Sequence, residues 1–247
     1  MPALWASSVR GETGRADDGL LPAVSALTAR ASRPLAALGV LGVAFVLYTQ
    51  VVAAGAAEAL DLDVARAAAR AWWPPLQPAA QAIAVVGGLE VTSGIAIGLA
   101  VSLWAVGFRA EAAALAIFPL LGALEAMYKY VLAHPPPAGF AHPDGPSLVT
   151  MLHHGTLTFG GSYPSGHMMR TVFVYGLGAF VVSRLARPRW GWLAVAVAAT
   201  VVGLMALDRV YLGVHWQSDV VGGLLLGGAV LAGAVAWLDR PAGAAGG

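Results

Sequence analysis

Long apolar runs separated by short polar connections constrain the fold of this chain more than any other feature of its sequence. A transmembrane helix needs about 20 predominantly apolar residues, and in a bilayer only helices and closed barrels satisfy all their backbone hydrogen-bonding groups. Runs of that length occur at about residues 35–57, 79–106, 112–132, 165–182, 190–207 and 220–238. The pattern therefore predicts an all-α integral membrane bundle of six transmembrane helices.

The composition excludes a soluble globular domain. Hydrophobic residues make up 58% of the 247 residues and charged residues only 11%, against about 25% in an average soluble domain. A formal net charge of +1 gives no basic surface for nucleic acid. The absence of cysteine excludes disulfides and thiolate metal sites.

Three segments are expected along the chain. Residues 1–33 are polar and contain several arginines, which predicts an N-terminal cytoplasmic tail or an interfacial helix. Residues 34–240 form the predicted six-helix domain, and residues 241–247 a disordered tail. Within the domain, residues 133–163 make a long loop rich in Pro, Gly and His, and loops of this length are usually functional or disordered.

Lys and Arg fall mainly on one side of the six-span arrangement. The N-terminus, the turn at Arg109, the turn at residues 183–189 and Arg240 share that side, whereas the 133–163 loop has no Lys or Arg. Two arginines in the first loop are exceptions. Because cytoplasmic loops carry the excess of positive charge, the arginine-rich side is predicted to be cytoplasmic.

The polar residues between the last two runs have the character of a catalytic site. Arg209, His215 and Asp219 lie together at a predicted membrane surface. A carboxylate four residues after an imidazole can share its helical face, and so orient and polarise it. Arg209 offers a planar set of donors that suits a phosphate.

A second polar cluster, Pro164-Ser165-Gly166-His167, opens the fourth run, and Lys129 lies near the end of the third. Under the six-span topology both reach the extracytoplasmic face, as do Arg209, His215 and Asp219. Together the three groups indicate phosphoryl chemistry at that face of the membrane.

The two clusters resemble the second and third signature motifs of the type 2 phosphatidic acid phosphatase family, whose superfamily includes vanadium-dependent haloperoxidases. The resemblance covers about residues 128–223 and implies a phosphatidic acid phosphatase type 2/haloperoxidase-like fold. It implies a metal-independent phosphatase without a cofactor, in which His215 is the nucleophile and forms a phosphohistidine. Asp219 would orient His215, and His167 would protonate the leaving oxygen. The phosphate oxygens would be bound by Lys129, Ser165, Gly166 and Arg209.

The first family motif is altered in this chain. The resemblance predicts Lys, six residues, Arg and Pro, but the arginine position after Lys129 holds Pro136, with His134 nearby. Arg170, one helical turn after His167, is expected to supply part of the missing positive charge at the phosphate. An ion pair with Glu90 or Glu125 is the alternative explanation for a charge in an apolar run. Asp208 also stands where the family usually has serine.

Several of these residues have simpler structural explanations. His215 beside Trp216 could be an interfacial anchor, Ser165 a helix cap, and Lys129 a side chain that extends to the membrane surface. A metal site at His153-His154 is the weakest alternative, because no carboxylate or cysteine follows at ligand spacing.

The sequence predicts a lipid phosphatase that hydrolyses a phosphomonoester or diphosphate on a lipid, such as phosphatidic acid, phosphatidylglycerol phosphate or a polyprenyl diphosphate. The lipid substrate and the membrane are the expected partners, without nucleic acid. The expected location is the bacterial inner membrane, with the site on the extracytoplasmic face. Two alternatives stay open: a lipid phosphotransferase, and a non-catalytic lipid-binding or transport protein on the same fold.

Overall fold

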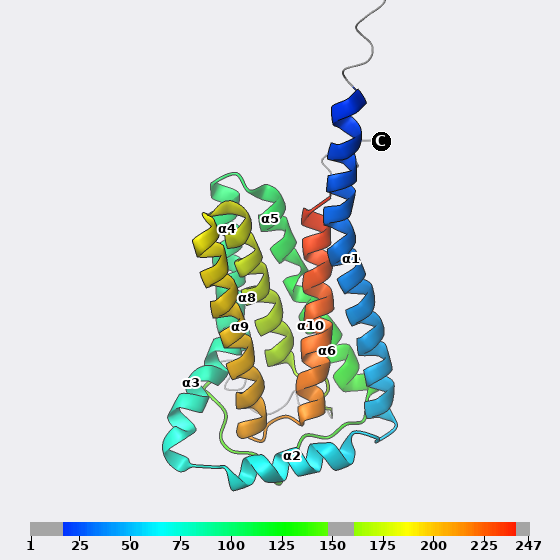
Figure 1. Ribbon diagram of the computed structural model, residues 1–247. Coiled ribbons are helices and arrows are strands. Elements are labelled where there is room, and N and C mark those ends of the chain that lie inside the picture. The colour runs from blue at the N-terminus through cyan, green and yellow to red at the C-terminus, as the bar shows by residue number, and fades with distance from the viewer. Residues whose placement is uncertain (1–16, 148–160, 241–247) are drawn as a thin grey trace, which may run out of the picture.

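The computed structural model describes residues 17–147 and 161–240, and every regular element in this part of the chain is a helix (Figure 1). Five segments are long and apolar enough to cross a membrane: Ser32–Ala53, Arg109–Val131, Gly166–Leu185, Pro188–Tyr211 and Gln217–Leu238. The helical segments Pro74–Gly87 and Leu89–Ala105 meet at an angle of 43°, and together they provide a sixth. The prediction of an all-α membrane bundle is confirmed.

The helix boundaries refine the predicted spans. Helix α1 (Asp17–Ala53) continues without a break through residue 33, where the membrane domain is predicted to begin. The second span is η1 (Pro74–Leu76), α3 (Gln77–Gly87) and α4 (Leu89–Ala105), and the third is α5 (Arg109–Ala114), η2 (Leu115–Ile117) and α6 (Phe118–Val131). The last three are α8 (Gly166–Leu185), α9 (Pro188–Tyr211) and α10 (Gln217–Leu238). Proline stands in the first turn of η1, α3, α6 and α9, where its missing N–H leaves no helical bond unmade.

The polar stretch after the first span forms a helix that the sequence analysis did not predict. Helix α2 (Glu58–Arg70) lies across the lower end of the bundle and contacts α9 and α10 (Figure 1). It is amphipathic, because Asp61 and Ala65 are buried while Asp63 and Arg66 are exposed. This helix therefore brings a buried carboxylate, Asp61, to the start of α10.

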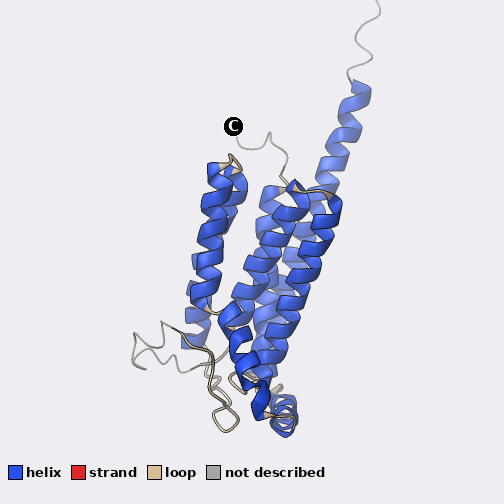
Figure 2. Ribbon diagram, turned by 90° about the vertical axis from the view of Figure 1, so that its left-hand side faces the viewer, coloured by secondary structure: helices blue, strands red, loops and turns tan. Residues whose placement is uncertain are grey.

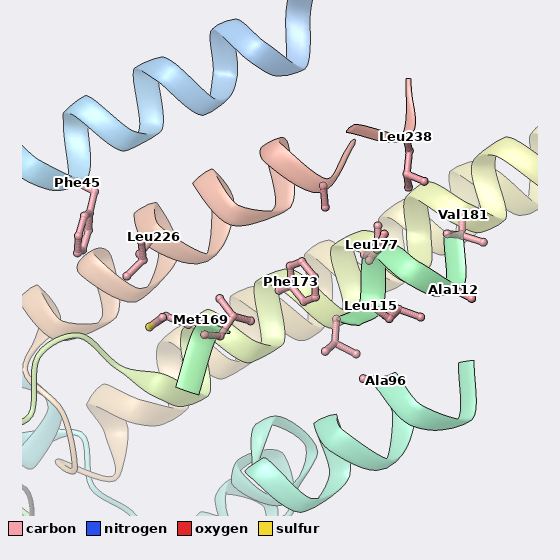
Figure 3. Packing of buried hydrophobic residues seen from close by; sticks show 14 of the residues in the cluster. Phe45, Ala96, Ala112, Leu115, Met169, Phe173, Leu177, Val181, Leu226 and Leu238 are labelled. Carbon is pink, nitrogen blue, oxygen red and sulfur yellow. The ribbon is translucent and has the colours of Figure 1, made fainter. Parts of the chain in front are cut away.

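Helix α8 is the centre of the packing. Met169, Phe173 and Leu177 follow its length and belong to one buried cluster with Leu226 of α10 (Figure 3). The two helices approach closely because small residues face each other: a Cβ at Gly223 would lie 2.6 Å from the carbonyl oxygen of Ser165. Such contacts matter in a bilayer, where helices associate through packing and not through exclusion of water.

The two ends of the bundle differ in character. The turn between α8 and α9, with three arginines at residues 184, 187 and 189, lies at the upper end together with the start of α5 (Figure 1). The end of α6 and the starts of α8 and α10 lie at the lower end, where the loops gather (Figure 2). Between the two ends, apolar side chains such as Val40, Ile97 and Leu207 are largely exposed, as expected of a surface that faces lipid.

Candidate active site

The connection between α9 and α10 returns His215 to the side of Arg209. Gly213 has a φ of +63°, a left-handed conformation that other residues rarely adopt. A Cβ at this position would also overlap the backbone carbonyl of Phe140. The turn lets the backbone N–H groups of Val214 and His215 both donate to the carbonyl oxygen of Arg209, at 3.3 Å each.

His215 and Asp219 form the hydrogen-bonded pair that their spacing predicts. His215 Nδ1 lies 3.1 Å from Asp219 Oδ2, and the backbone N–H of Trp216 donates to the same oxygen at 3.0 Å. Burial lowers the pKa of His215; Asp219 opposes this effect, and the nearby charges of Lys129 and Arg209 add to it. A neutral imidazole held at Nδ1 by a carboxylate keeps Nε2 available as a nucleophile.

Helix α8 begins directly beside this pair. The backbone N–H of Ser165 donates to the carbonyl oxygen of Asp219 at 3.0 Å, so that amide is already occupied. Ser165 stands at the N-cap position, but its side chain makes no capping bond. Its Oγ is fully buried and has no hydrogen-bond partner among the described residues. Because an unpaired buried hydroxyl is costly, Ser165 Oγ is a group that a bound ligand could satisfy.

One carboxylate, Glu125 of α6, pairs with two of the predicted phosphate-binding cations. Lys129 Nζ lies 2.7 Å from Glu125 Oε1, and Arg170 Nη1 lies 2.5 Å from Oε2. Lys129 therefore stays inside the bundle, with 16% of its side chain exposed, and does not extend to the membrane surface. Arg170 has the carboxylate partner expected of a buried charge, but its Nε has none in the described part of the chain. The Glu125 carboxylate also contacts Gly166 so closely that a Cβ there would overlap it.

Arg209 is completely buried between two carboxylates. Its Nη1 and Nη2 donate to the two oxygens of Asp144, at 2.9 and 3.0 Å. Its Nε and Nη2 donate to Asp208 Oδ2, at 3.1 and 2.5 Å. Asp208 is a buried residue of α9, whereas Asp144 belongs to a loop and has a side chain that is 38% exposed. Both donor edges of the guanidinium are thus occupied by charge-assisted bonds.

Asp144 is positioned by a short segment, residues 142–147, which we call the strap. The strap is non-helical but fixed at several points. The His142 ring stacks on Trp72, with centroids 3.4 Å apart. Gln81 Nε2 donates to the carbonyl oxygens of residues 143 and 144, at 3.2 and 3.4 Å. Ser147 Oγ donates to Glu90 Oε1 at 2.7 Å. These contacts join the strap to α3 and α4.

A cavity of about 590 Å³ lies between the strap and helices α3, α4, α6 and α8. Its polar lining consists of Glu90, Glu125, Lys129, Asp144, Ser147, His167 and Arg170. His167 shares this lining with Lys129 and Arg170, and Asp144 of the same lining binds Arg209. The structure therefore brings the predicted site residues from α6, α8, α9 and α10 together at one end of the bundle.

Some polar residues of the site were not predicted as part of it. Asp144 lies in a loop, where no periodic pattern marks it. Glu125 stands four residues before Lys129, and this spacing could have indicated that the two would pair. His153 and His154 lie outside the described residues, and within those residues no three His, Asp or Glu side chains are grouped to hold a metal.

Known proteins resemble this chain in sequence and in fold. The PAP2 superfamily model matches residues 110–241. An undecaprenyl-diphosphatase from Sulfolobus acidocaldarius is 36% identical over 99 residues, which are 40% of this chain and 41% of the relative. Phosphatidylglycerophosphatase B from Bacillus subtilis is 34% identical over 84 residues, 33% of this chain and 39% of the relative. The chain thus spans less than half the length of these curated relatives.

A solved structure matches more of the chain. The transmembrane PAP2-type phosphatidylglycerolphosphate phosphatase from Bacillus subtilis superposes with a TM-score of 0.67 at 22% sequence identity. The match covers 78% of this chain and 92% of that protein. It confirms the fold predicted from the sequence.

Proposed function

The chain belongs to the PAP2 superfamily, and we propose that it is an integral membrane phosphatase that hydrolyses a phosphomonoester or diphosphate on a lipid. The names of both curated relatives describe phosphatases of lipid phosphates. Phosphatidic acid, phosphatidylglycerol phosphate and polyprenyl diphosphates are the candidate substrates. Each combines a terminal phosphoryl group with a long apolar tail, which suits a site at the end of a membrane bundle.

The observation that carries this proposal is the arrangement around His215. Its Nδ1 is held by the buried carboxylate of Asp219, and it lies within the electrostatic reach of Lys129 and Arg209. A nucleophile, a group that orients it and cations that stabilise a phosphate are the components of phosphoryl transfer through a covalent intermediate. Lipid binding alone would require only the cations.

The proposed reaction has two steps. His215 Nε2 attacks phosphorus, an N–P bond forms while the bond from phosphorus to the leaving oxygen breaks, and His167 gives that oxygen a proton. Water then attacks the phosphohistidine, His167 accepts the proton from this water, and the N–P bond breaks. Inorganic phosphate is released, and both histidines return to their starting protonation states.

Phosphate binding is assigned to the two cations that line the cavity, to Arg209 behind Asp144, and to the start of α8. Lys129, Arg170 and Arg209 supply positive charge, while Ser165 Oγ and the Gly166 backbone at the helix N-terminus supply hydrogen-bond donors. The Nε of Arg170 has no hydrogen-bond partner among the described residues, which supports its assignment in place of the arginine that the family has where this chain has Pro136.

We assign the site to the extracytoplasmic face of a bacterial inner membrane, because the arginine-rich turns lie at the opposite end of the bundle. The chain has no cysteine, so single cysteines can report on each end. Arg187→Cys and Gly139→Cys both substitute exposed positions. In intact cells a membrane-impermeant thiol reagent should label Gly139→Cys alone, and labelling of Arg187→Cys alone would reverse the orientation.

The direct test is phosphate release from a panel of purified lipid phosphates, with and without a chelator. Wild type should release phosphate from at least one lipid in both conditions, and His215→Ala should release none. A phosphoenzyme that is labile in acid should be trapped in wild type and absent in the variant. The proposal fails if wild type is inactive on the whole panel, or if His215→Ala retains turnover within a few-fold of wild type.

A further inference from the structure

Behind Asp219, on the side away from His215, polar side chains from three separate segments meet. Asp61 of α2 accepts two bonds from Ser218, from the backbone N–H at 2.9 Å and from the hydroxyl at 2.6 Å. His134, from the loop after α6, places its Nε2 3.3 Å from Ser218 Oγ and 3.4 Å from Asp219 Oδ1. Asp61, Ser218 and Asp219 are at most 2% exposed, so this cluster lies inside the protein.

The bonding pattern decides where the proton of His134 lies. The only hydroxyl proton of Ser218 is donated to Asp61, so Ser218 Oγ can act only as an acceptor toward His134. Asp219 Oδ1 is likewise an acceptor: it is buried, makes no hydrogen bond among the described residues, and has His134 Nε2 3.4 Å away. An unprotonated Nε2 would direct its lone pair at the lone pairs of Ser218 Oγ and Asp219 Oδ1, which is repulsive. We therefore place the hydrogen on Nε2, which lies 3.3 Å from Ser218 Oγ and 3.4 Å from Asp219 Oδ1.

The backbone around His134 is fixed, so this contact does not depend on a loose loop. The N–H and the hydroxyl of Ser162 both donate to the His134 carbonyl oxygen, at 2.8 and 2.9 Å. The next residue, Pro135, accepts a bond from the indole N–H of Trp216 at 2.7 Å. The His134 ring also meets Tyr163 edge-on, with centroids 6.3 Å apart.

We propose that His134 is a positioning residue for the nucleophile: its Nε2–H holds Oδ1 of Asp219, so that Oδ2 stays aligned with Nδ1 of His215. This inference rests on the proposed function of His215. Without His134, the donors that the described residues supply to the Asp219 carboxylate all lie on Oδ2, and the carboxylate can rotate away from the line to the imidazole. His134 lies two residues before Pro136, so the segment with the altered first motif contributes to the nucleophile pair instead of supplying an arginine to the phosphate.

The test compares substitutions that keep or remove the donor. In His134→Gln the side-chain amide nitrogen can occupy the place of Nε2, whereas in His134→Asn it stops near the place of Nδ1. His134→Leu keeps the volume and removes the donor. We expect kcat to fall at least tenfold in His134→Leu and His134→Asn, with KM within about twofold of wild type, and His134→Gln to recover most of the loss. Equal rates in the Gln and Asn variants would overturn the proposal.

The pH profile separates positioning from a merely structural role. The groups that face His215 are Asp219, Lys129, Arg209 and His167. Asp219 raises the pKa of His215, so an Asp219 carboxylate that has turned out of line stabilises the imidazolium less, and the acid limb of kcat/KM should move to lower pH in His134→Leu. An unmoved limb in His134→Leu, with the protein folded, contradicts the proposal.

The proton assignment can be tested without turnover. In ¹⁵N-histidine-labelled protein, the His134 signals can be identified by their loss in His134→Gln, and they should report a proton on Nε2. The opposite tautomer would overturn the inference. Wild type inactive on every lipid would refute the proposed function, whereas active wild type with an unaffected His134→Leu variant would refute only the role of His134.

Discussion

Replacing Asp144 with asparagine should strengthen phosphate binding, because Asp144 occupies the donors of Arg209 that a phosphate needs. Arg209 makes two bonds to each of Asp144 and Asp208, so these two carboxylates occupy both donor edges of its guanidinium. Asp144 is the carboxylate that a phosphate can displace, since it lies in a loop and its side chain is 38% exposed, whereas Asp208 is buried on a helix. A phosphate that binds Arg209 must therefore displace Asp144.

The size of the effect follows from the bonds that are displaced. A hydrogen bond to a charged group contributes about 1.5–3 kcal/mol, and the exposure of Asp144 reduces the value for this pair to about 1–2 kcal/mol. An asparagine amide retains one acceptor and no charge, so most of this competition disappears. The Ki of inorganic phosphate or vanadate should fall roughly five- to thirtyfold.

The assay is inhibition of lipid phosphate turnover in detergent at constant ionic strength. Asp63→Asn is the matched control, because it removes the same charge from an exposed position on α2. Its Ki should equal that of wild type. A Ki for Asp144→Asn that is unchanged or higher would refute the displacement, and would mean that Asp144 stays in place and orients Arg209 for the phosphate.

Three further predictions concern the nucleophile, the second arginine and the packing. Because burial lowers the pKa of His215, the imidazole stays neutral to lower pH. The apparent pKa of the acid limb of kcat/KM should therefore lie below the ordinary histidine value of about 6.5. A pH–rate profile with an apparent pKa above that value would contradict this. Arg170→Lys should lower kcat/KM about tenfold, roughly 1.4 kcal/mol, since lysine cannot pair with Glu125 and also present a second planar donor to phosphate; near-normal kinetics would make Arg170 purely structural. Gly223→Ala should lower the free energy of unfolding by about 1–3 kcal/mol, as its Cβ would lie 2.6 Å from the Ser165 carbonyl. Gly233→Ala on the same helix, with no atom nearer than 3.7 Å, should melt in detergent like wild type.

The spans could be predicted from the sequence because the bilayer imposes one requirement on each of them, a helix of sufficient apolar length. Helix α2 escaped the same reasoning, since it lies at the lower end of the bundle and its burial depends on contacts with α9 and α10. The break at Gly88 was also missed, because the bend falls inside one continuous apolar run.

The contacts of the site likewise divide into those that the sequence predicts and those that depend on the fold. The contact between His215 and Asp219 could be predicted, because a separation of four residues is a local property of a helix start. The partners of the cations depend on the fold: Asp144 and Arg209 are 65 residues apart, and Asp61 and Ser218 are 157 apart. No spacing rule reaches that far, so the acidic half of the site becomes visible only in three dimensions.

The pairing of each cation with a carboxylate affects which lipid headgroups can bind in the site. Glu125 pairs with Lys129 and Arg170, and Asp144 and Asp208 pair with Arg209. A headgroup that binds these cations must therefore replace a carboxylate that already pairs with them. A phosphodiester has one negative charge and gains little by replacing a carboxylate. A phosphomonoester is close to a dianion at neutral pH and brings a third acceptor oxygen. If the chain is the lipid phosphatase that we propose, we therefore expect a resting site that is already neutralised to disfavour the surrounding phosphodiester lipids and to admit the rarer headgroup with a terminal phosphate.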